Sequence, residues 1–421
     1  MDDENDSDVP IDTYDDVSIK VSIDKDVVKK LAQQGDLYIN QDIQQVQKAI
    51  DLFLNSDFAA AEKFLKTQYC KTLYYTFGYG TILFLKSVMT FVPTDIHDCS
   101  VALENSVHLA SMLRKPQGIM SSLTGYLTGK GAKEVAHLKS MNKLERHAEL
   151  VYAESFLIKA QLSLVTDNNM VAFIREGLKI QASYSIFKNM YRFLRKVYSE
   201  DGKEGFEKYN IDEHFISGVL FGNGAFNMIL SMMPSKLLKL FEFIGFSGNR
   251  QFSMSCLETG AKWPKRDTSM CYPEPKKGVP LDKITVPFKV NDGMAGNRAF
   301  LSDLCLLSYH IIFSSMIQLP DSNMPLAGTM VEIQLKKYPS SFIFLALKAR
   351  LEQSKCNPDL AEIQYIKVIE QQRDWRNLTH VSYWDLGFCQ ASQGKWEEAA
   401  QSFELLHKES KWRYLNSCYN L

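Results

Sequence analysis

The chain has 421 residues, of which 45% are hydrophobic and 23% are charged, and these fractions are typical of a soluble folded protein. Its formal net charge of -1 gives no overall field that would favour a nucleic acid or an acidic membrane surface. The eight cysteines are scattered without a CxxC pair, and the acidic N-terminus is unlike a secretory leader. We therefore expect reduced thiols in a cytoplasmic or nuclear protein.

Residues 1–43 are predicted to form an acidic, disordered tail. The first 16 residues carry eight acidic side chains and no basic one, so they have too little apolar surface to repay the entropy of folding. A helical pattern first becomes clear after Gln44, where Val46, Ile50 and Phe53 fall on one face of a 3.6-residue period. We place the first helical-repeat region at residues 44–261.

Amphipathic helices separated by short polar turns recur along this region. Residues 80–91 are followed by 93–115, and residues 144–165 are followed by 170–196. The pattern then breaks, because five of the 13 prolines lie between Pro264 and Pro287. We predict a Pro- and Lys-rich irregular insertion at 262–298, which we expect to be disordered. A strand at 283–290 is disfavoured by Pro287. Helical repeats resume at 299–421.

One spacing recurs in three helix pairs. Small residues 12 positions apart occupy Ala49 and Ala61, Ala349 and Ala361, and Gly387 and Ala399. A large apolar or aromatic residue follows each pair by four positions, at Leu65, Tyr365 and Phe403. A single match would fit any antiparallel helix pair, which wants small residues at its closest approach. Three matches favour an all-α solenoid of stacked antiparallel helix pairs, of the tetratricopeptide type.

The end of the chain is predicted to be an incomplete repeat. The terminal WRYLNSCYNL reads as the first helix of a pair with no second helix. Because solenoids usually end in a polar capping element, we expect a truncated or alternatively spliced product.

Several longer stretches carry a family resemblance. They are Phe226-Asn227, the turn from Leu230 to Pro234, LLKLFEFIGFSGNR from Leu237 to Arg250, and residues 49–58, 78–91 and 406–412. Together they resemble the tetratricopeptide repeat protein 39 family, which includes a fungal inclusion-body clearance protein, over residues 44–421. The resemblance implies a cytoplasmic adaptor linked to lipid-droplet, sterol or protein-quality-control regulation. It also implies peripheral association with lipid droplets or membranes.

No motif indicates catalysis, a cofactor or a metal. The eight histidines show no HExxH or paired Cys/His spacing. The glycines of GYLTGKGAK at 125–133 have the wrong spacing for a phosphate loop, GNGAF at 222–226 contains only a bare GxG, and no GxSxG turn is present. Residues 300–319 are apolar but contain Asp303 and His310, which favours a buried helix over a membrane span.

We therefore predict a non-catalytic scaffold whose partners are other proteins, bound as a peptide or helix in the concave groove that first helices line. We expect no nucleic acid partner and no transmembrane segment. The alternative is a lipid or sterol carrier that uses an apolar cavity in the middle of the solenoid, near Phe226 to Phe246. An unrecognised enzyme stays open if a pocket gathers carboxylates of perturbed acidity.

Overall fold

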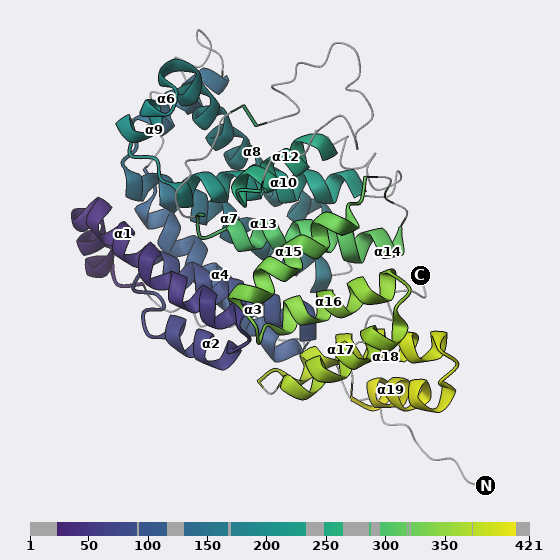
Figure 1. Ribbon diagram of the computed structural model, residues 1–421. Coiled ribbons are helices and arrows are strands. Elements are labelled where there is room, and N and C mark those ends of the chain that lie inside the picture. The colour runs from purple at the N-terminus through teal and green to yellow at the C-terminus, as the bar shows by residue number, and fades with distance from the viewer. Residues whose placement is uncertain are drawn as a thin grey trace.

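The computed structural model describes residues 23–90, 92–115, 130–166, 170–232, 248–263, 286–287, 295–317, 319, 321–372 and 374–409. This part of the chain is helical and contains no strand (Figure 1). The N-terminal helices are α1 (Lys25–Leu54), α2 (Phe58–Lys66), α3 (Leu73–Thr90), α4 (Pro93–Leu113), α6 (Lys130–Lys139), α7 (Lys143–Thr166), α8 (Met170–Asp201), α9 (Glu204–Lys208), α10 (Glu213–Met232) and α12 (Arg250–Gly260). After these come α13 (Ala299–Leu307), the π-helical η2 (Ser308–Phe313), α14 (Ser314–Met316), α15 (Met324–Lys337), α16 (Phe342–Ser354), α17 (Pro358–Gln371), the 3-10 turn η3 (Arg376–Leu378), α18 (Thr379–Ser392) and α19 (Trp396–Glu409).

The first helix begins earlier than the sequence indicates. Helix α1 starts at Lys25 and buries Val28, Leu31 and Ile39, so the prediction of a disordered tail is wrong for residues 25–43. Gly35 breaks the helical geometry with a φ of 50°. Because this kink shifts the phase of the apolar positions, the segment before it does not continue the period that is visible after Gln44. Residues 1–22 lie outside the described residues.

Three helix pairs share one register, as the repeated spacing predicts. The small residues that define the spacing are all buried, and the pairs are α1–α2, α16–α17 and α18–α19. Seven residues after the first small position, each pair has a left-handed residue: Ser56 (φ 68°), Cys356 (φ 61°) and Gly394 (φ 74°). The next amide in each turn donates to a carbonyl five residues earlier, at 2.9–3.0 Å, which ends the first helix and reverses the chain. The turns are therefore equivalent, and the last two pairs lie 38 residues apart (Ala349 to Gly387), slightly more than the roughly 34 of the repeat type.

The segment that carries the family resemblance packs as a helical corner. Asn249 caps α12 by accepting from the amide of Phe252 at 2.9 Å, and its own amide donates to the side chain of Asn227 on α10 at 3.1 Å. Arg250 donates to the carboxylate of Asp321 at 3.3 Å. These contacts fix how α10, α12 and the chain before α15 meet. Residues 233–247, with the predicted turn at Pro234, lie outside the described residues.

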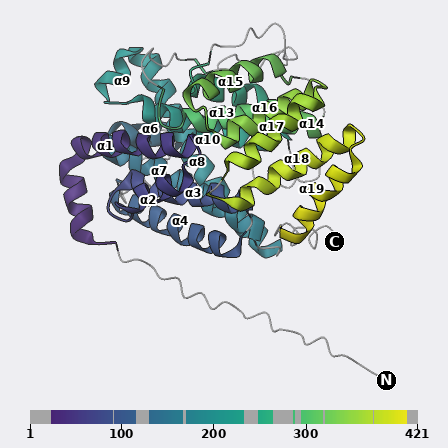
Figure 2. The same cartoon turned by 60° about the horizontal axis from the view of Figure 1, so that its bottom comes forward.

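The two ends of the chain share one hydrophobic core, which runs from Ile23 to Leu378. The turn of the first pair lies against the turn before α16, where the Phe342 amide donates to the Ser56 hydroxyl at 2.6 Å. Phe58 stacks on Trp375, with ring centroids 4.3 Å apart. Figures 1 and 2 both show the C-terminal helices, in green and yellow, beside the purple N-terminal ones. The repeat regions 44–261 and 299–421 are therefore packed against each other and do not form a single open row.

The predicted insertion at 262–298 is described only at its edges. Residues 264–285 and 288–294, with most of the candidate strand, lie outside the described residues. The last residues of the insertion are not loose, because Asn297 and Arg298 are buried at 6% and 2% exposure. Gly296 makes this possible, since a Cβ there would lie 2.2 Å from the Glu213 carbonyl oxygen.

Two helical stretches of the described chain are long and apolar enough to cross a membrane by length and composition. They are Glu213–Met232, which is 72% buried over the relevant window, and Ala299–Met316, which is 44% buried. The first lies in the core between α8 and α12, as core helices of soluble proteins do.

Candidate partner-binding site

The last helix pair exposes a group of aromatic residues, which we call the aromatic face. Trp384 and Phe388 lie one turn apart on α18, and Trp396 and Phe403 lie two turns apart on α19. The Phe388 and Phe403 ring centroids are 5.3 Å apart in an edge-to-face arrangement. Phe388 is 49% exposed and Trp396 is 69% exposed. Exposed Trp and Phe side chains that contact each other are typical of the energetic centre of a protein interface.

The equivalent positions of the earlier helix pairs contact a neighbouring helix. Counting back 38 residues, Phe388 and Phe403 correspond to Arg350 and Tyr365 of the preceding pair. Arg350 forms a bidentate ion pair with Asp385 on α18, and Tyr365 is fully buried in a cluster with Leu386 of the same helix. In the first pair, Leu65 corresponds to Tyr365 and packs under Gly78 of α3, whose Cβ position lies 3.2 Å away. Each earlier pair therefore presents these positions to the first helix that follows it.

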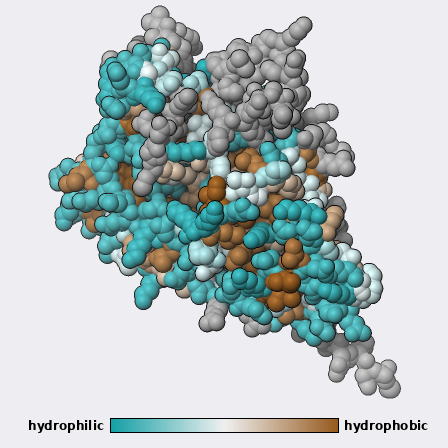
Figure 3. All heavy atoms as spheres, viewed as in Figure 1, coloured by the Kyte–Doolittle hydropathy of each residue, from teal (hydrophilic) through white to brown (hydrophobic). Residues whose placement is uncertain are grey.

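The first helices of the last two pairs differ in the apolar surface that they expose. Helix α16 exposes none of its large apolar side chains, whereas α18 exposes Trp384 and Phe388. Besides the aromatic face, exposed apolar residues line the outer side of α17 at Leu360, Ile363 and Ile366. Figure 3 shows brown surface among these C-terminal helices. The aromatic face differs from the α17 stripe because only the former has a repeat-equivalent contact elsewhere in the chain.

A chain of charged and polar side chains crosses the core between α3, α7 and α13. Arg298 forms a buried bidentate ion pair with Glu154, with nitrogen–oxygen distances of 3.0 and 2.5 Å. Arg298 also donates to the Tyr74 hydroxyl at 2.7 Å, and that hydroxyl lies 2.6 Å from Nδ1 of His147. On the far side of the ring, His147 Nε2 is 3.3 Å from Asp212.

The ionisation of His147 and Asp212 indicates where the protons lie in this hydrogen-bonded network. Burial lowers the pKa of His147, so the ring is neutral. Although burial opposes its ionisation, the pKa of Asp212 lies below its usual value because of His147 and Lys143, so the carboxylate is charged. Nε2 therefore carries the ring proton toward Asp212, and Tyr74 donates to Nδ1. The order resembles a catalytic relay, but its side chains are almost fully buried and each polar contact joins a different helix or loop.

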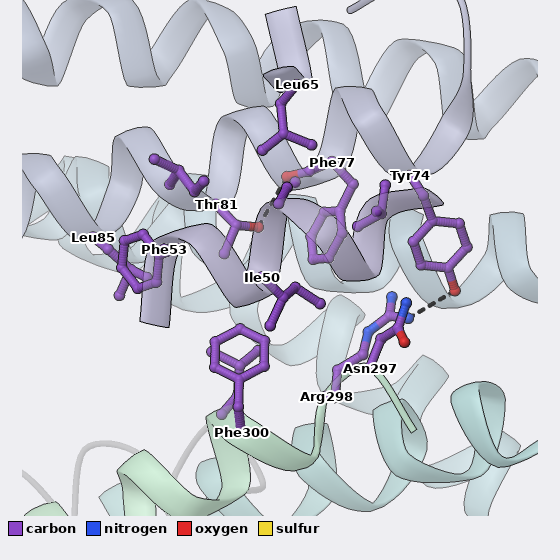
Figure 4. Close-up of a pocket in the computed structure, with 15 residues that line it drawn as sticks. Ile50, Phe53, Leu65, Tyr74, Phe77, Thr81, Leu85, Asn297, Arg298 and Phe300 are labelled. Atoms are coloured by element: carbon purple, nitrogen blue, oxygen red, sulfur yellow. Dashed lines mark hydrogen bonds between the residues drawn. The ribbon is translucent and has the colours of Figure 1, made fainter. Parts of the chain in front are cut away.

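A small cavity of about 60 Å³ borders this network between α1, α3 and α13. Its lining is mostly apolar, apart from Thr81 and from one end where Tyr74, Asn297 and Arg298 meet (Figure 4). The cavity can hold one or two waters but no substrate, since a water occupies about 30 Å³ in the liquid. The network and the cavity are therefore structural.

A second cavity, of about 570 Å³, contains two carboxylates, Asp51 and Asp303. Burial raises the pKa of Asp303 to about 7, against donors on both of its oxygens: Trp263 Nε1 at 2.5 Å and Gln334 Nε2 at 2.7 Å. Asp51 accepts from the Tyr338 hydroxyl at 2.7 Å. The pKa of Asp303 is raised, as the pKa of a catalytic carboxylate often is. Its hydrogen bonds, however, join α13 to α15 and to the residues that follow α12, which indicates a structural role.

This raised pKa gives a testable dependence on pH. In the unfolded chain Asp303 ionises near 3.8, so between pH 4 and 7 the folded protein binds the additional proton and stability falls as pH rises. Asp303→Asn is expected to raise the free energy of unfolding by about 1–2 kcal/mol at pH 8 and to change it little at pH 4. Urea unfolding at the two pH values measures this. If Asp303→Asn changed the free energy of unfolding equally at both pH values, the prediction that the ionised form of Asp303 destabilises the protein would be wrong.

The described residues contain no group of three or more His, Cys, Asp or Glu side chains that could hold a metal. Of the eight histidines, His147, His310 and His380 are buried. Six cysteines are described, all as free thiols: Cys70, Cys99, Cys256, Cys305, Cys356 and Cys389. Cys271 and Cys418 lie outside the described residues, as do most of the glycines of 125–133. GNGAF at 222–226 lies inside α10 and serves packing.

Sequence reasoning missed both the aromatic face and the buried network. For the face a signal existed, because Phe388 stands 38 residues after the charged Arg350, at the same position of the next pair. For the network no local signal existed, because Arg298 and Glu154 are 144 residues apart.

The fold and the repeated turns define an all-α helical-repeat protein of the tetratricopeptide type. The model of the family Iml2/Tetratricopeptide repeat protein 39 matches residues 47–272 and 294–420, and the chain belongs to this family. The chain is similar to tetratricopeptide repeat protein ttc-39B of Caenorhabditis elegans, with 29% identity over 387 residues. That alignment covers 92% of this chain and 60% of the relative, so the chain spans less than two thirds of the relative's length. No solved structure matches it.

Proposed function

We propose that the protein is a non-catalytic adaptor that binds a helix of another protein on the aromatic face of α18 and α19. The observation that supports this most is the exposure of three large aromatic side chains on this face, Trp384, Phe388 and Trp396. Phe403 stands where Tyr365 of the preceding pair contacts α18, so the position suits a helix. A partner helix with an apolar stripe would bury these rings as α18 buries Tyr365.

The wider role follows the family. Tetratricopeptide-type proteins bind other proteins, and this chain carries their helix pairs. We place the adaptor in the cytoplasm, with a role in lipid-droplet, sterol or protein-quality-control regulation. The family resemblance is what supports this placement.

Affinity capture with paired variants tests the proposal. Phe388→Asp puts a charge at the centre of the aromatic face, whereas Ile363→Asp puts the same charge on the exposed stripe of α17, where the residue is 59% exposed. We expect a reproducible set of partner proteins with the unmodified chain and with Ile363→Asp. Phe388→Asp should reduce their recovery by roughly 30-fold, the effect of losing an interface contact worth about 2 kcal/mol.

Two outcomes would overturn the proposal. One is a partner set that Phe388→Asp retains in full. The other is the absence of any protein above background when circular dichroism shows that the captured chain is folded.

A further inference from the structure

A third cavity lies in the middle of the molecule, between α3, α7, α10 and the α13–η2 segment. Its volume is about 350 Å³, within the roughly 300–1,000 Å³ of pockets that hold drug-sized molecules. Protein interiors normally leave few voids larger than a water molecule, because side chains pack as densely as organic crystals. An apolar void of this size is therefore expected to hold a ligand.

The chemistry of the walls limits what that ligand can be. Phe221, Ala225 and Ile229 repeat at every fourth position of α10 and bring one face of this helix to the cavity, with Leu301 and Leu304 of α13 also in its wall. None of the described lining residues carries a positive charge. The charged side chain among them is Glu154, whose carboxylate is already paired with Arg298. An anionic ligand would meet no cation and one carboxylate.

Three neutral polar side chains stand in the described wall: Thr81 of α3, whose hydroxyl already donates to the Phe77 carbonyl at 2.9 Å, Gln161 of α7 and Ser308 of η2. Gln161 and Ser308 can each exchange a hydrogen bond with a hydroxyl group of a ligand. Ser308 is also the first residue of the π-helical segment, and Phe313, the last, lines the same cavity. Single-turn π-helical segments inside α-helices are frequent at functional sites, which gives a second and independent indication of a site here.

The cavity reaches the surface. Two of its lining residues, Ile229 and Phe313, are 44% and 36% exposed. Beside them along the chain, Met316 and Ile317 are also exposed. These exposed residues of the described chain are all apolar, so an apolar molecule meets apolar side chains at this part of the rim.

We propose that this cavity binds one molecule of a neutral lipid, an uncharged hydrocarbon chain or sterol ring system that carries a hydroxyl group. The hydrocarbon lies among the α10 and α13 side chains, and the hydroxyl pairs with Gln161 or Ser308. The site is separate from the aromatic face, since it is built by different helices. A failure of protein binding at Phe388 leaves this inference untouched.

Equilibrium binding of three radiolabelled probes to the full chain tests this: 1-monooleoylglycerol, cholesterol and oleate. We expect saturable binding of at least one neutral probe at one molecule per chain, and oleate at least 10-fold weaker. Ala225→Phe fills the cavity from α10 and should weaken the neutral probe at least 10-fold. Ala59→Phe, the same change at an exposed position of α2, should bind as the unmodified chain does.

A second variant keeps the test decisive if Ala225→Phe fails to fold. Ile229→Lys places a cation at the rim, on a side chain that is already 44% exposed. It should weaken the neutral probe and strengthen oleate. The proposal is overturned if neither neutral probe binds saturably, if oleate binds the unmodified chain as tightly as the neutral probes, or if a folded Ala225→Phe binds unchanged.

Discussion

Replacement of Arg298 by methionine is expected to lower the free energy of unfolding by about 3–5 kcal/mol at pH 7.5. The change removes the partner of Glu154, which is only 3% exposed and would be left as a buried, uncompensated charge. Tyr74 would also lose the donor on its hydroxyl. Urea denaturation followed by circular dichroism measures the effect, because the helical signal reports the whole fold.

The effect should also depend on pH. Burial already raises the pKa of Glu154, and the loss of Arg298, which opposes that shift, would raise this pKa further. A folded-state pKa above the unfolded value means that the folded protein keeps its proton to higher pH, so the destabilisation grows as pH rises. The loss at pH 5 should therefore be smaller than the loss at pH 7.5.

The double variant Arg298→Met/Glu154→Met is the matched control. Replacing both charges by apolar groups of similar volume leaves no buried ion, so it should recover at least half of the lost stability. Arg298→Lys keeps the charge but not the bidentate geometry and should fall between the two. A double variant less stable than Arg298→Met would show that the pair itself, and not the orphaned charge, carries the effect.

The fold was predictable where the residues that determine it are close in sequence. The spacing of Gly387 and Ala399 reports a contact within one helix pair, since a Cβ at Gly387 would lie 2.8 Å from the Phe403 ring. The turn of this pair lies between those two residues, at Gly394, whose φ is 74°. The start of α1 was not predictable, because Gly35 interrupts the period and only Val28 and Leu31 are buried in the helix before it.

The candidate sites were harder to predict, because they depend on contacts between distant segments. The packing of Phe58 on Trp375 joins residues more than 300 positions apart, and no helical period reports it. The sequence suggested a cavity near Phe226 only through the apolar character of that segment, whereas the volume of the cavity depends on side chains from five α-helices and η2. Exposure decides the role of Phe388, and its position in α18 alone would equally fit a buried residue.

Replacement of Gly222 by alanine is expected to destabilise the protein by about 3 kcal/mol, although alanine is the better helix former by roughly 1 kcal/mol. Gly222 lies inside α10, where an added Cβ would be 2.2 Å from Cε1 of the Phe187 ring on α8. That ring is fully buried, and a shift of it would rearrange the wall of the third cavity, which Phe187 and Gly222 both line. The energetic cost of this close contact therefore exceeds the gain in helix propensity.

Two further variants separate the steric cost of the added methyl group from the gain in helix propensity. Thermal and urea unfolding measure both. Gly328→Ala in α15 meets nothing within 4 Å and should stabilise by roughly 0.5–1 kcal/mol, because only the propensity changes. Phe187→Leu should destabilise the unmodified chain but cost less in the Gly222→Ala background, since the smaller side chain leaves room for the methyl group. If Gly222→Ala stabilised the protein as Gly328→Ala does, α8 and α10 would not approach each other as closely as this glycine allows.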